Sequence, residues 1–182
     1  MNKCQEIFGR PAERTEKKVR AYMVNWVMSF IENSPFMVLS TCDSQGSPDA
    51  SPRGGKPGFV KIINNTTLIL PDVAGNKLFQ SYENMEGNPN VGMLFFIPGE
   101  NSMVRINGSA QVVRPGNDEY EKLELNVFSP EENRKLIQAI VVTVSEAYSH
   151  CPRAVSYSKL WDTEKISSNI ESPKIPKWKP GT

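Results

Sequence analysis

Cationic side chains and glycines gather in one short segment of the sequence, residues 51–61. It contains Arg53, Lys56 and Lys61 together with three glycines. Arginine binds phosphate through two parallel hydrogen bonds, lysine binds it as a point charge, and glycine lets the backbone come close to a ligand. The segment therefore indicates a site for a phosphate-like anion. An exposed loop with solvated charges is the alternative interpretation of the same residues.

A second anion site is indicated where a predicted strand end leads into a predicted helix. This segment contains Leu70, Pro71 and Asp72, followed by Asn76 and Lys77. The free N–H groups of a helix N-terminus attract an anion, and Lys77 would add a full positive charge. Ordinary capping of the helix by Asp72 or Asn76 explains the same residues without any ligand.

A third candidate lies within a strand predicted to begin at Met103. Strict alternation places Met103, Arg105 and Asn107 on one face of this strand and apolar residues on the other face. The apolar face belongs to a core. The face with Arg105 is either a solvated surface, which is the commoner place for arginine, or the wall of a ligand site.

Rare residue types also gather towards the end of the chain, at His150, Cys151 and Trp161. Neighbouring residues on an extended strand point to opposite faces, which argues against a cysteine nucleophile with a histidine base. His150 is the only histidine, so a multi-histidine metal site is excluded. The three cysteines show no disulfide or zinc pattern. No catalytic residue and no metal ligand is assigned.

Short strands and a few helices must position these candidates. Closure into a barrel hides the edges that regularly spaced antiparallel strands would otherwise expose, so we predict a mainly β, α+β barrel. Helices are expected at residues 13–33, from Asp72 to the stop at 87–89, and at 118–128. Strands are expected at 36–41, from Pro48 on, and at 59–63, 67–70, 91–97, 103–113 and 139–148.

Composition favours one ordinary globular domain over residues 1–182. Its two ends are expected to be a helical segment, residues 1–34, and an extended arm, residues 165–182. The 21 basic and 20 acidic residues nearly balance, so neither nucleic acid nor an anionic membrane is expected as a partner. The sequence shows no signal-peptide pattern and no apolar run of membrane-spanning length, and we therefore expect a cytoplasmic protein.

Four motifs, in a fixed order, carry a resemblance to a known family: DASPRGGKPGFVKI, LILPDVAGNKLFQSYENMEGNPNVGMLFFIPG, MVRINGSA and HCPRAVSYSKLW. Over roughly residues 35–162, the sequence resembles the FMN-binding branch of the pyridoxamine 5'-phosphate oxidase-like family. The resemblance implies a six-stranded antiparallel split barrel with flanking helices. It also implies a homodimer that holds FMN at the subunit interface.

The resemblance further implies which residues contact FMN, with Arg53 at the phosphate. Four positions depart from the family pattern: Pro71 and Asp72 replace an aromatic–threonine pair, Leu78 replaces the second residue of a basic pair whose first residue is Lys77, and Met103 replaces a glutamine. Residues that the true oxidase needs for pyridoxal phosphate have no counterpart, so vitamin B6 oxidation is not expected. The expected cofactor-binding residues are Ser51, Arg53, Gly54, Val60, Lys61, Leu70, Pro71, Asp72, Asn76, Lys77, Met103, Arg105 and Trp161.

Several functions are compatible with these patterns. The first hypothesis is an FMN-dependent oxidoreductase that acts on a small molecule or accepts electrons from a nicotinamide donor. The second is a non-catalytic protein that binds or stores FMN. The third is a heme-binding split barrel, for which His150 is the only possible histidine ligand. The fourth is a structural dimer without a ligand.

Overall fold

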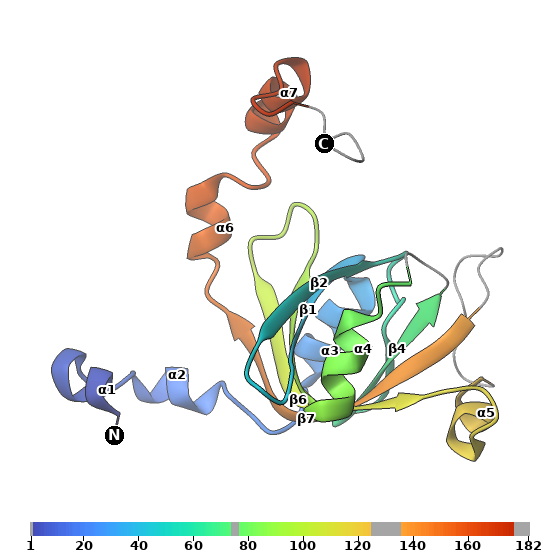
Figure 1. The fold of residues 1–182 in the computed structure, drawn as a ribbon. Helices are drawn as coiled ribbons and strands as arrows, with labels where there is room; N and C mark the ends of the chain where they lie inside the picture. The colour runs from blue at the N-terminus through green and yellow to red at the C-terminus, as the bar shows by residue number, and fades with distance from the viewer. Residues whose placement is uncertain (1, 74–76, 125–135, 177–182) are drawn as a thin grey trace.

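One antiparallel sheet of seven strands forms the body of the protein (Figure 1). The computed structural model describes residues 2–73, 77–124 and 136–176. The strand order is β2-β1-β5-β6-β7-β4-β3, so β2 and β3 are the two edges of the sheet. The predicted α+β, mainly β class is confirmed. The seven strands correspond to the seven segments predicted as strands, whereas the split barrel implied by the resemblance has six.

The elements follow one another in nearly the predicted order. The strands are β1 (Phe36–Cys42), β2 (Pro48–Gly54), β3 (Lys61–Asn64), β4 (Thr67–Val73), β5 (Asn90–Phe96), β6 (Met103–Val113) and β7 (Leu136–His150). The helices are α1 (Lys3–Phe8), α2 (Glu13–Lys17), α3 (Asn25–Asn33), α4 (Gln80–Gly87), α5 (Asp118–Glu124), α6 (Arg153–Ser158) and α7 (Thr163–Glu171).

Apolar side chains of α3 and of the sheet make up the main core. Val27, Phe30 and Ile31 of α3 are buried, as their spacing of three and four residues predicts. They belong to the same apolar cluster as Leu39 of β1 and Phe95 of β5. Burial of this apolar face positions α3 against the sheet and leaves the opposite, polar face of the helix in water.

The helix predicted over residues 13–33 is wrong in its middle. The chain leaves the helical conformation after α2, and Arg20 forms a β-bridge with Ala147 of β7. Its backbone N–H donates to the Ala147 carbonyl at 3.2 Å, and the Ala147 N–H donates back at 2.7 Å. Pairing with a neighbouring strand satisfies these backbone groups, and it therefore outweighs the local helical periodicity.

Two further predictions about helices need correction. No helix starts at Asp72, because β4 continues through Val73 in pairing with β7, and α4 begins only at Gln80. The first part of the arm predicted for residues 165–182 is helical rather than extended, since α7 reaches Glu171. Asp162 caps α7 by accepting a hydrogen bond from the Lys165 N–H at 2.8 Å, a local signal for a helix start.

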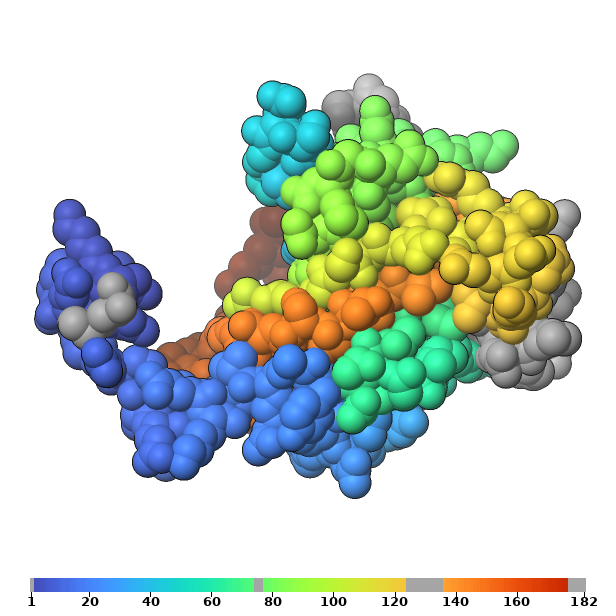
Figure 2. Space-filling view, turned by 90° about the horizontal axis from the view of Figure 1, so that it is seen from below, coloured from blue at the N-terminus to red at the C-terminus, as the bar shows by residue number. Residues whose placement is uncertain are grey.

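Both terminal segments extend away from the barrel (Figure 1). In the space-filling view, the N-terminal helices project from one side of the body (Figure 2). The segment that follows them joins the sheet where Arg20 pairs with Ala147 of β7. None of the residues of α1, α2 or α7 is buried. Within the described part of the chain, no helix has the length and apolar character needed to cross a membrane.

Candidate functional site

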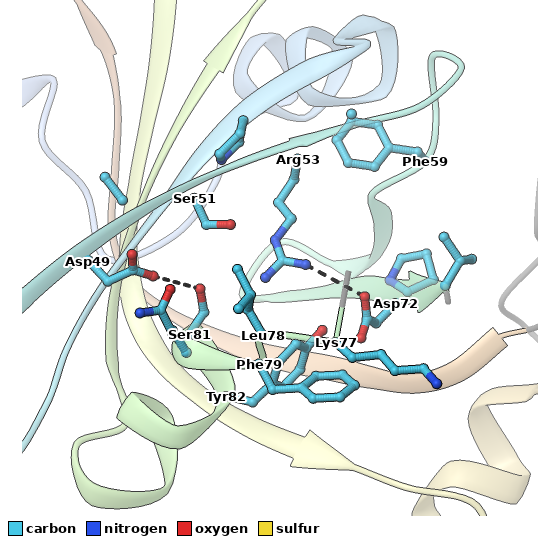
Figure 3. A pocket seen from close by; sticks show the side chains of 16 residues that line it. Asp49, Ser51, Arg53, Phe59, Asp72, Lys77, Leu78, Phe79, Ser81 and Tyr82 are labelled. Atoms are coloured by element: carbon cyan, nitrogen blue, oxygen red, sulfur yellow. Dashed lines mark hydrogen bonds and ion pairs between the residues drawn. The ribbon is translucent and has the colours of Figure 1, made fainter. Parts of the chain in front are cut away.

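A cavity of about 470 Å³ lies between β2, the end of β4 and the start of α4 (Figure 3). Cavities of this size accommodate small ligands and cofactors. The walls come from the edge strand β2, from β4 next to the opposite edge of the sheet, and from α4. The polar side chains that converge on the cavity are Asp49, Ser51, Arg53, Asp72, Lys77, Gln80, Ser81 and Tyr82.

Alternation along β2 brings three polar side chains to the cavity. Asp49, Ser51 and Arg53 are partly buried and line it, while the residues between them are exposed. Among the described strands, β2 pairs only with β1. Pro48 and Pro52, which cannot donate to a ladder, are tolerated on such an edge strand. The polar inner face of β2 thus meets the cavity rather than an apolar core.

Arg53 reaches across the cavity (Figure 3). Its Nη1 lies 3.5 Å from Oδ1 of Asp72, and its Cζ lies 5.6 Å from the centre of the Tyr82 ring. The Nε atom of Arg53 is buried and has no hydrogen-bond partner among the described residues. Buried donors are normally paired, so this N–H lacks an acceptor that a bound ligand could supply.

Asp72 is held in place from the β7 side. Its side chain is 11% exposed, and Oδ2 accepts a hydrogen bond from Nε2 of Gln138 at 3.1 Å. Gln138 in turn accepts from Nε of Arg114 at 3.3 Å, and Arg114 forms a 2.8 Å ion pair with Glu86 of α4. This chain of contacts fixes the carboxylate opposite Arg53.

Tyr82 of α4 provides a second unpaired donor. The residue is 4% exposed, and its hydroxyl has no hydrogen-bond partner among the described residues. Burial raises the pKa of the Tyr82 phenol, the Asp72 carboxylate raises it further, and Arg53 acts in the opposite direction. The phenol is protonated at physiological pH, so its hydroxyl can donate a hydrogen bond to a ligand.

The loop before α4 completes the cavity. Lys77 and Phe79 both have positive φ angles, 61° and 54°, a conformation that is uncommon for residues other than glycine. Phe79 occupies the N-cap position of α4 without a side-chain hydrogen bond, so Asp72 does not cap this helix. The other predicted cap, Asn76, lies outside the described residues. Below this loop, the Ser81 hydroxyl donates to Oδ2 of Asp49 at 2.8 Å and ties α4 to β2.

The structure brings together six of the predicted site residues and separates the others. Asn76 lies outside the described residues. Val60, Leu70 and Met103 are buried in the single chain and do not line this cavity, and Val60 and Leu70 belong to the apolar core. Their contact with FMN stays a prediction. The residues that line the cavity are Ser51, Arg53, Gly54, Pro71, Asp72 and Lys77.

The remaining predicted residues lie elsewhere. Lys61 borders a separate hollow beside Glu32. Nε of Arg105 donates to Oδ1 of Asn107 at 3.4 Å, and its guanidinium lies 5.9 Å from the Tyr148 ring centre, away from the cavity. Nε1 of Trp161 donates to the carbonyl oxygen of Glu100 at 2.9 Å. Within the described single chain, these side chains and Arg53 do not form one site.

Sequence reasoning missed two important members of the site. Asp49 alternates with Ser51 and Arg53, and a period of two along β2 would have identified it. Tyr82 matched the apolar stripe of α4, and nothing in the sequence shows that its hydroxyl is buried without a partner. Their positions depend on how β2, β4 and α4 pack together.

The barrel and its cavity define a split-barrel protein with a candidate site for a small polar ligand. Residues 23–151 match the model of the pyridoxamine 5'-phosphate oxidase family, and the chain belongs to this family. The matched residues include every strand of the sheet as well as α3 and α4. The resemblance found in the sequence is thereby confirmed.

Solved structures share this fold at low sequence identity. HupZ from Group A Streptococcus is 16% identical, with a TM-score of 0.55 over 70% of this chain and 93% of that chain. An FMN-binding protein from Syntrophomonas wolfei is 13% identical, with a TM-score of 0.52 over 69% of this chain and 84% of that chain. No curated protein sequence gives a significant match. Similarity at this level describes the fold alone.

The donors of the cavity fit the phosphate end of a flavin mononucleotide. They are the buried Nε of Arg53, the Tyr82 hydroxyl and the charged side chain of Lys77. Phosphate oxygens accept hydrogen bonds from such groups, and arginine and lysine also offset its charge. The Asp72 carboxylate is the part of the wall that opposes an anion.

Proposed function

We propose that this protein binds FMN and is an FMN-dependent oxidoreductase that acts on a small molecule. The observation that carries the proposal is the buried Nε of Arg53, which has no acceptor among the described residues of a 470 Å³ cavity. A phosphate oxygen would supply that acceptor. Membership of the pyridoxamine 5'-phosphate oxidase family and the fold shared with an FMN-binding protein also support it.

The residues of this chain would bind and orient the cofactor rather than carry out the redox step. Bound FMN supplies the hydride chemistry with a nicotinamide donor or a small substrate. Arg53 and Tyr82 would donate hydrogen bonds to the phosphate from groups that have no partner among the described residues, and Lys77 would add a positive charge at the cavity wall. No side chain is assigned a proton-transfer role.

We further propose a cytoplasmic homodimer with FMN at the subunit interface. Large apolar side chains of the terminal helices support a second chain as partner, because Phe8 is 84% exposed and Ile170 is 73% exposed. Cys4, Cys42 and Cys151 are free thiols, as is common in the reducing cytoplasm. Neither nucleic acid nor a membrane is part of this proposal.

The first experiment is an absorbance spectrum of the purified, untagged protein. If the protein binds FMN, we expect absorbance bands at about 370 and 450 nm and release of FMN on denaturation. Loss of the long-wavelength band on anaerobic addition of a reduced nicotinamide would support an oxidoreductase, and its persistence would favour a storage protein. A colourless protein that also fails to take up added FMN would overturn the proposal.

Substitution of Arg53 tests the position of the phosphate. Arg53→Ala should weaken FMN binding by about 1.5–3 kcal/mol, which corresponds to about tenfold to 150-fold, because a charged hydrogen-bond donor is lost. Quenching of flavin fluorescence in a titration measures the dissociation constant. Arg20→Ala is the matched control, since Arg20 contacts Tyr22 away from the cavity. Equal affinities of the two variants would show that Arg53 does not bind the phosphate.

A further inference from the structure

The contact between Arg53 and Asp72 joins two parts of the sheet that are not neighbours. Arg53 lies on the edge strand β2, whereas Asp72 lies on β4, next to the opposite edge strand β3. Nη1 of Arg53 is 3.5 Å from Oδ1 of Asp72, and both side chains line the cavity. A ligand in the cavity therefore meets the guanidinium together with its carboxylate partner.

The cavity is close to electrically neutral. Among the described residues that line it, the two cations Arg53 and Lys77 are balanced by the two carboxylates Asp49 and Asp72. Only Asp72 forms an ion pair with Arg53, whereas Asp49 accepts a hydrogen bond from Ser81 at 2.8 Å. A phosphate monoester carries about 1.5 to 2 negative charges at neutral pH, and a carboxylate a few ångströms away repels it.

We propose that Asp72 competes with the ligand phosphate for Arg53 and so sets which form of flavin the site accepts. The site then holds FMN more weakly than Arg53 alone would allow, and it distinguishes FMN only slightly from the uncharged riboflavin. Gln138 holds Asp72 with a 3.1 Å hydrogen bond, so the carboxylate does not simply swing away when a phosphate arrives. This inference rests on the proposed function, flavin binding in this cavity.

A different role for Asp72 predicts the opposite result. Asp72 could act only to orient Arg53, as carboxylates beside arginine often do. Removal of the carboxylate would then loosen the guanidinium and weaken FMN binding. The sign of the change in FMN affinity therefore distinguishes competition from positioning.

The test measures dissociation constants of FMN and riboflavin for the full-length protein at one ionic strength. Asp72→Asn removes the charge and keeps the shape of the side chain. We expect FMN to bind about tenfold more tightly to Asp72→Asn, because a unit negative charge beside the phosphate is gone. Riboflavin should change less than about twofold, since it has no phosphate to repel.

Asp49→Asn is the matched control, because it removes a carboxylate of the same cavity that does not pair with Arg53. It should tighten FMN binding less than Asp72→Asn. If Asp72→Asn does not fold, Asp72→Thr replaces it, since threonine is uncharged and suits a strand. Circular dichroism confirms folding of each variant.

The outcomes separate this inference from the proposed function. Flavin binding that becomes weaker in Asp72→Asn, stays unchanged, or changes equally for FMN and riboflavin overturns the competition and leaves the proposed function intact. An equal gain in FMN affinity for Asp49→Asn also overturns it. If neither the wild-type protein nor any variant binds FMN or riboflavin, both the competition by Asp72 and the proposed function are rejected.

Discussion

Arg53, Asp72 and Tyr82 lie together in the cavity, and two of their buried polar groups have no hydrogen-bond partner in the described part of the chain. Arg53 and Asp72 contact each other, and Tyr82 lies against the guanidinium, yet Nε of Arg53 and the Tyr82 hydroxyl have no partner among the described residues. An unpaired buried donor costs about 1–3 kcal/mol. A folded protein keeps such a cost mainly where a ligand later supplies the acceptor, which is why we locate the site here.

Removal of the Tyr82 hydroxyl should reveal this cost. Tyr82→Phe keeps the buried ring and its contact with Arg53, so we expect the free energy of unfolding without ligand to rise by up to about 1 kcal/mol. The same change should weaken FMN binding if the hydroxyl donates to the cofactor. Urea denaturation measures the first effect and a fluorescence titration measures the second.

The control is Tyr22→Phe, which removes a hydroxyl that Arg20 contacts at 2.7 Å on the surface. That change should alter stability by less than about 0.5 kcal/mol. A loss of more than about 1 kcal/mol in Tyr82→Phe would mean that the hydroxyl already has a partner in the folded protein.

The raised pKa of Tyr82 makes an additional prediction about pH. In the unfolded chain the phenol loses its proton near pH 10, whereas in the folded protein it keeps the proton to higher pH. Stability from this group is therefore fully present below about pH 10 and falls above it, by up to about 1.4 kcal/mol per pH unit. Unfolding curves between pH 8 and about 11 should fall less steeply for Tyr82→Phe than for wild type. Parallel curves would contradict the burial of this phenol.

At the scale of elements, the pairing of β6 with β7 depends on one glycine. A Cβ added to Gly108 would clash with the backbone carbonyl oxygen of Thr143 on β7. The register of the two strands also shifts between Asn107 and Gly108, where the backbones approach closely. Backbone atoms cannot move aside as a flexible side chain can.

We therefore expect Gly108→Ala to lower the free energy of unfolding by about 1–3 kcal/mol, the usual cost of forcing extra atoms into a packed site. Urea denaturation of the variant and of wild type measures the difference. Gly87→Ala serves as the control, because its Cβ would make only ordinary contacts with Ser44. Similar stability of the two variants would show that β6 and β7 relax easily at this point.

The sequence predicts strands better than helix boundaries. The hairpin of β5 and β6 matches its prediction to within one residue at each end, since alternating or continuous apolar residues and the turn between them are local signals. The break between α2 and α3 is not local, because it depends on pairing of Arg20 with Ala147. The continuation of β4 through Asp72 depends in the same way on pairing with β7.

In the candidate site, too, local sequence signals predict some residues, and contacts between distant parts of the chain determine the others. Arg53 and Lys77 were identified from residue type and neighbouring glycines or helix signals, and both line the cavity. Tyr82 was not identified, and Val60 does not line this cavity, because burial of a hydroxyl or of an apolar side chain depends on contacts distant in sequence. Which of the predicted residues meet is decided by the curvature of the sheet, which brings β2 close to β4.

At the scale of the whole molecule, packing of the barrel does not account for the apolar side chains of the terminal helices. These helices extend away from the barrel (Figure 1), and apolar side chains of α1 and α7 are exposed. On α7, Ile166 and Ile170 are four residues apart and share one face of the helix. A second chain that covers this face would bury apolar surface that the single chain leaves in water.

The proposed homodimer can be tested on this face of α7. Ile170→Glu should leave the barrel folded, because Ile170 is exposed in the single chain. In the dimer, both copies of the charge would be buried, and a loss of at least about 1.5 kcal/mol for each copy corresponds to about a hundredfold weaker association. Sedimentation velocity over a range of concentrations measures this change. Ser168→Glu, on the other side of the same helix, is the control and should stay dimeric. Dimerisation of Ile170→Glu at the wild-type affinity would exclude α7 from the interface.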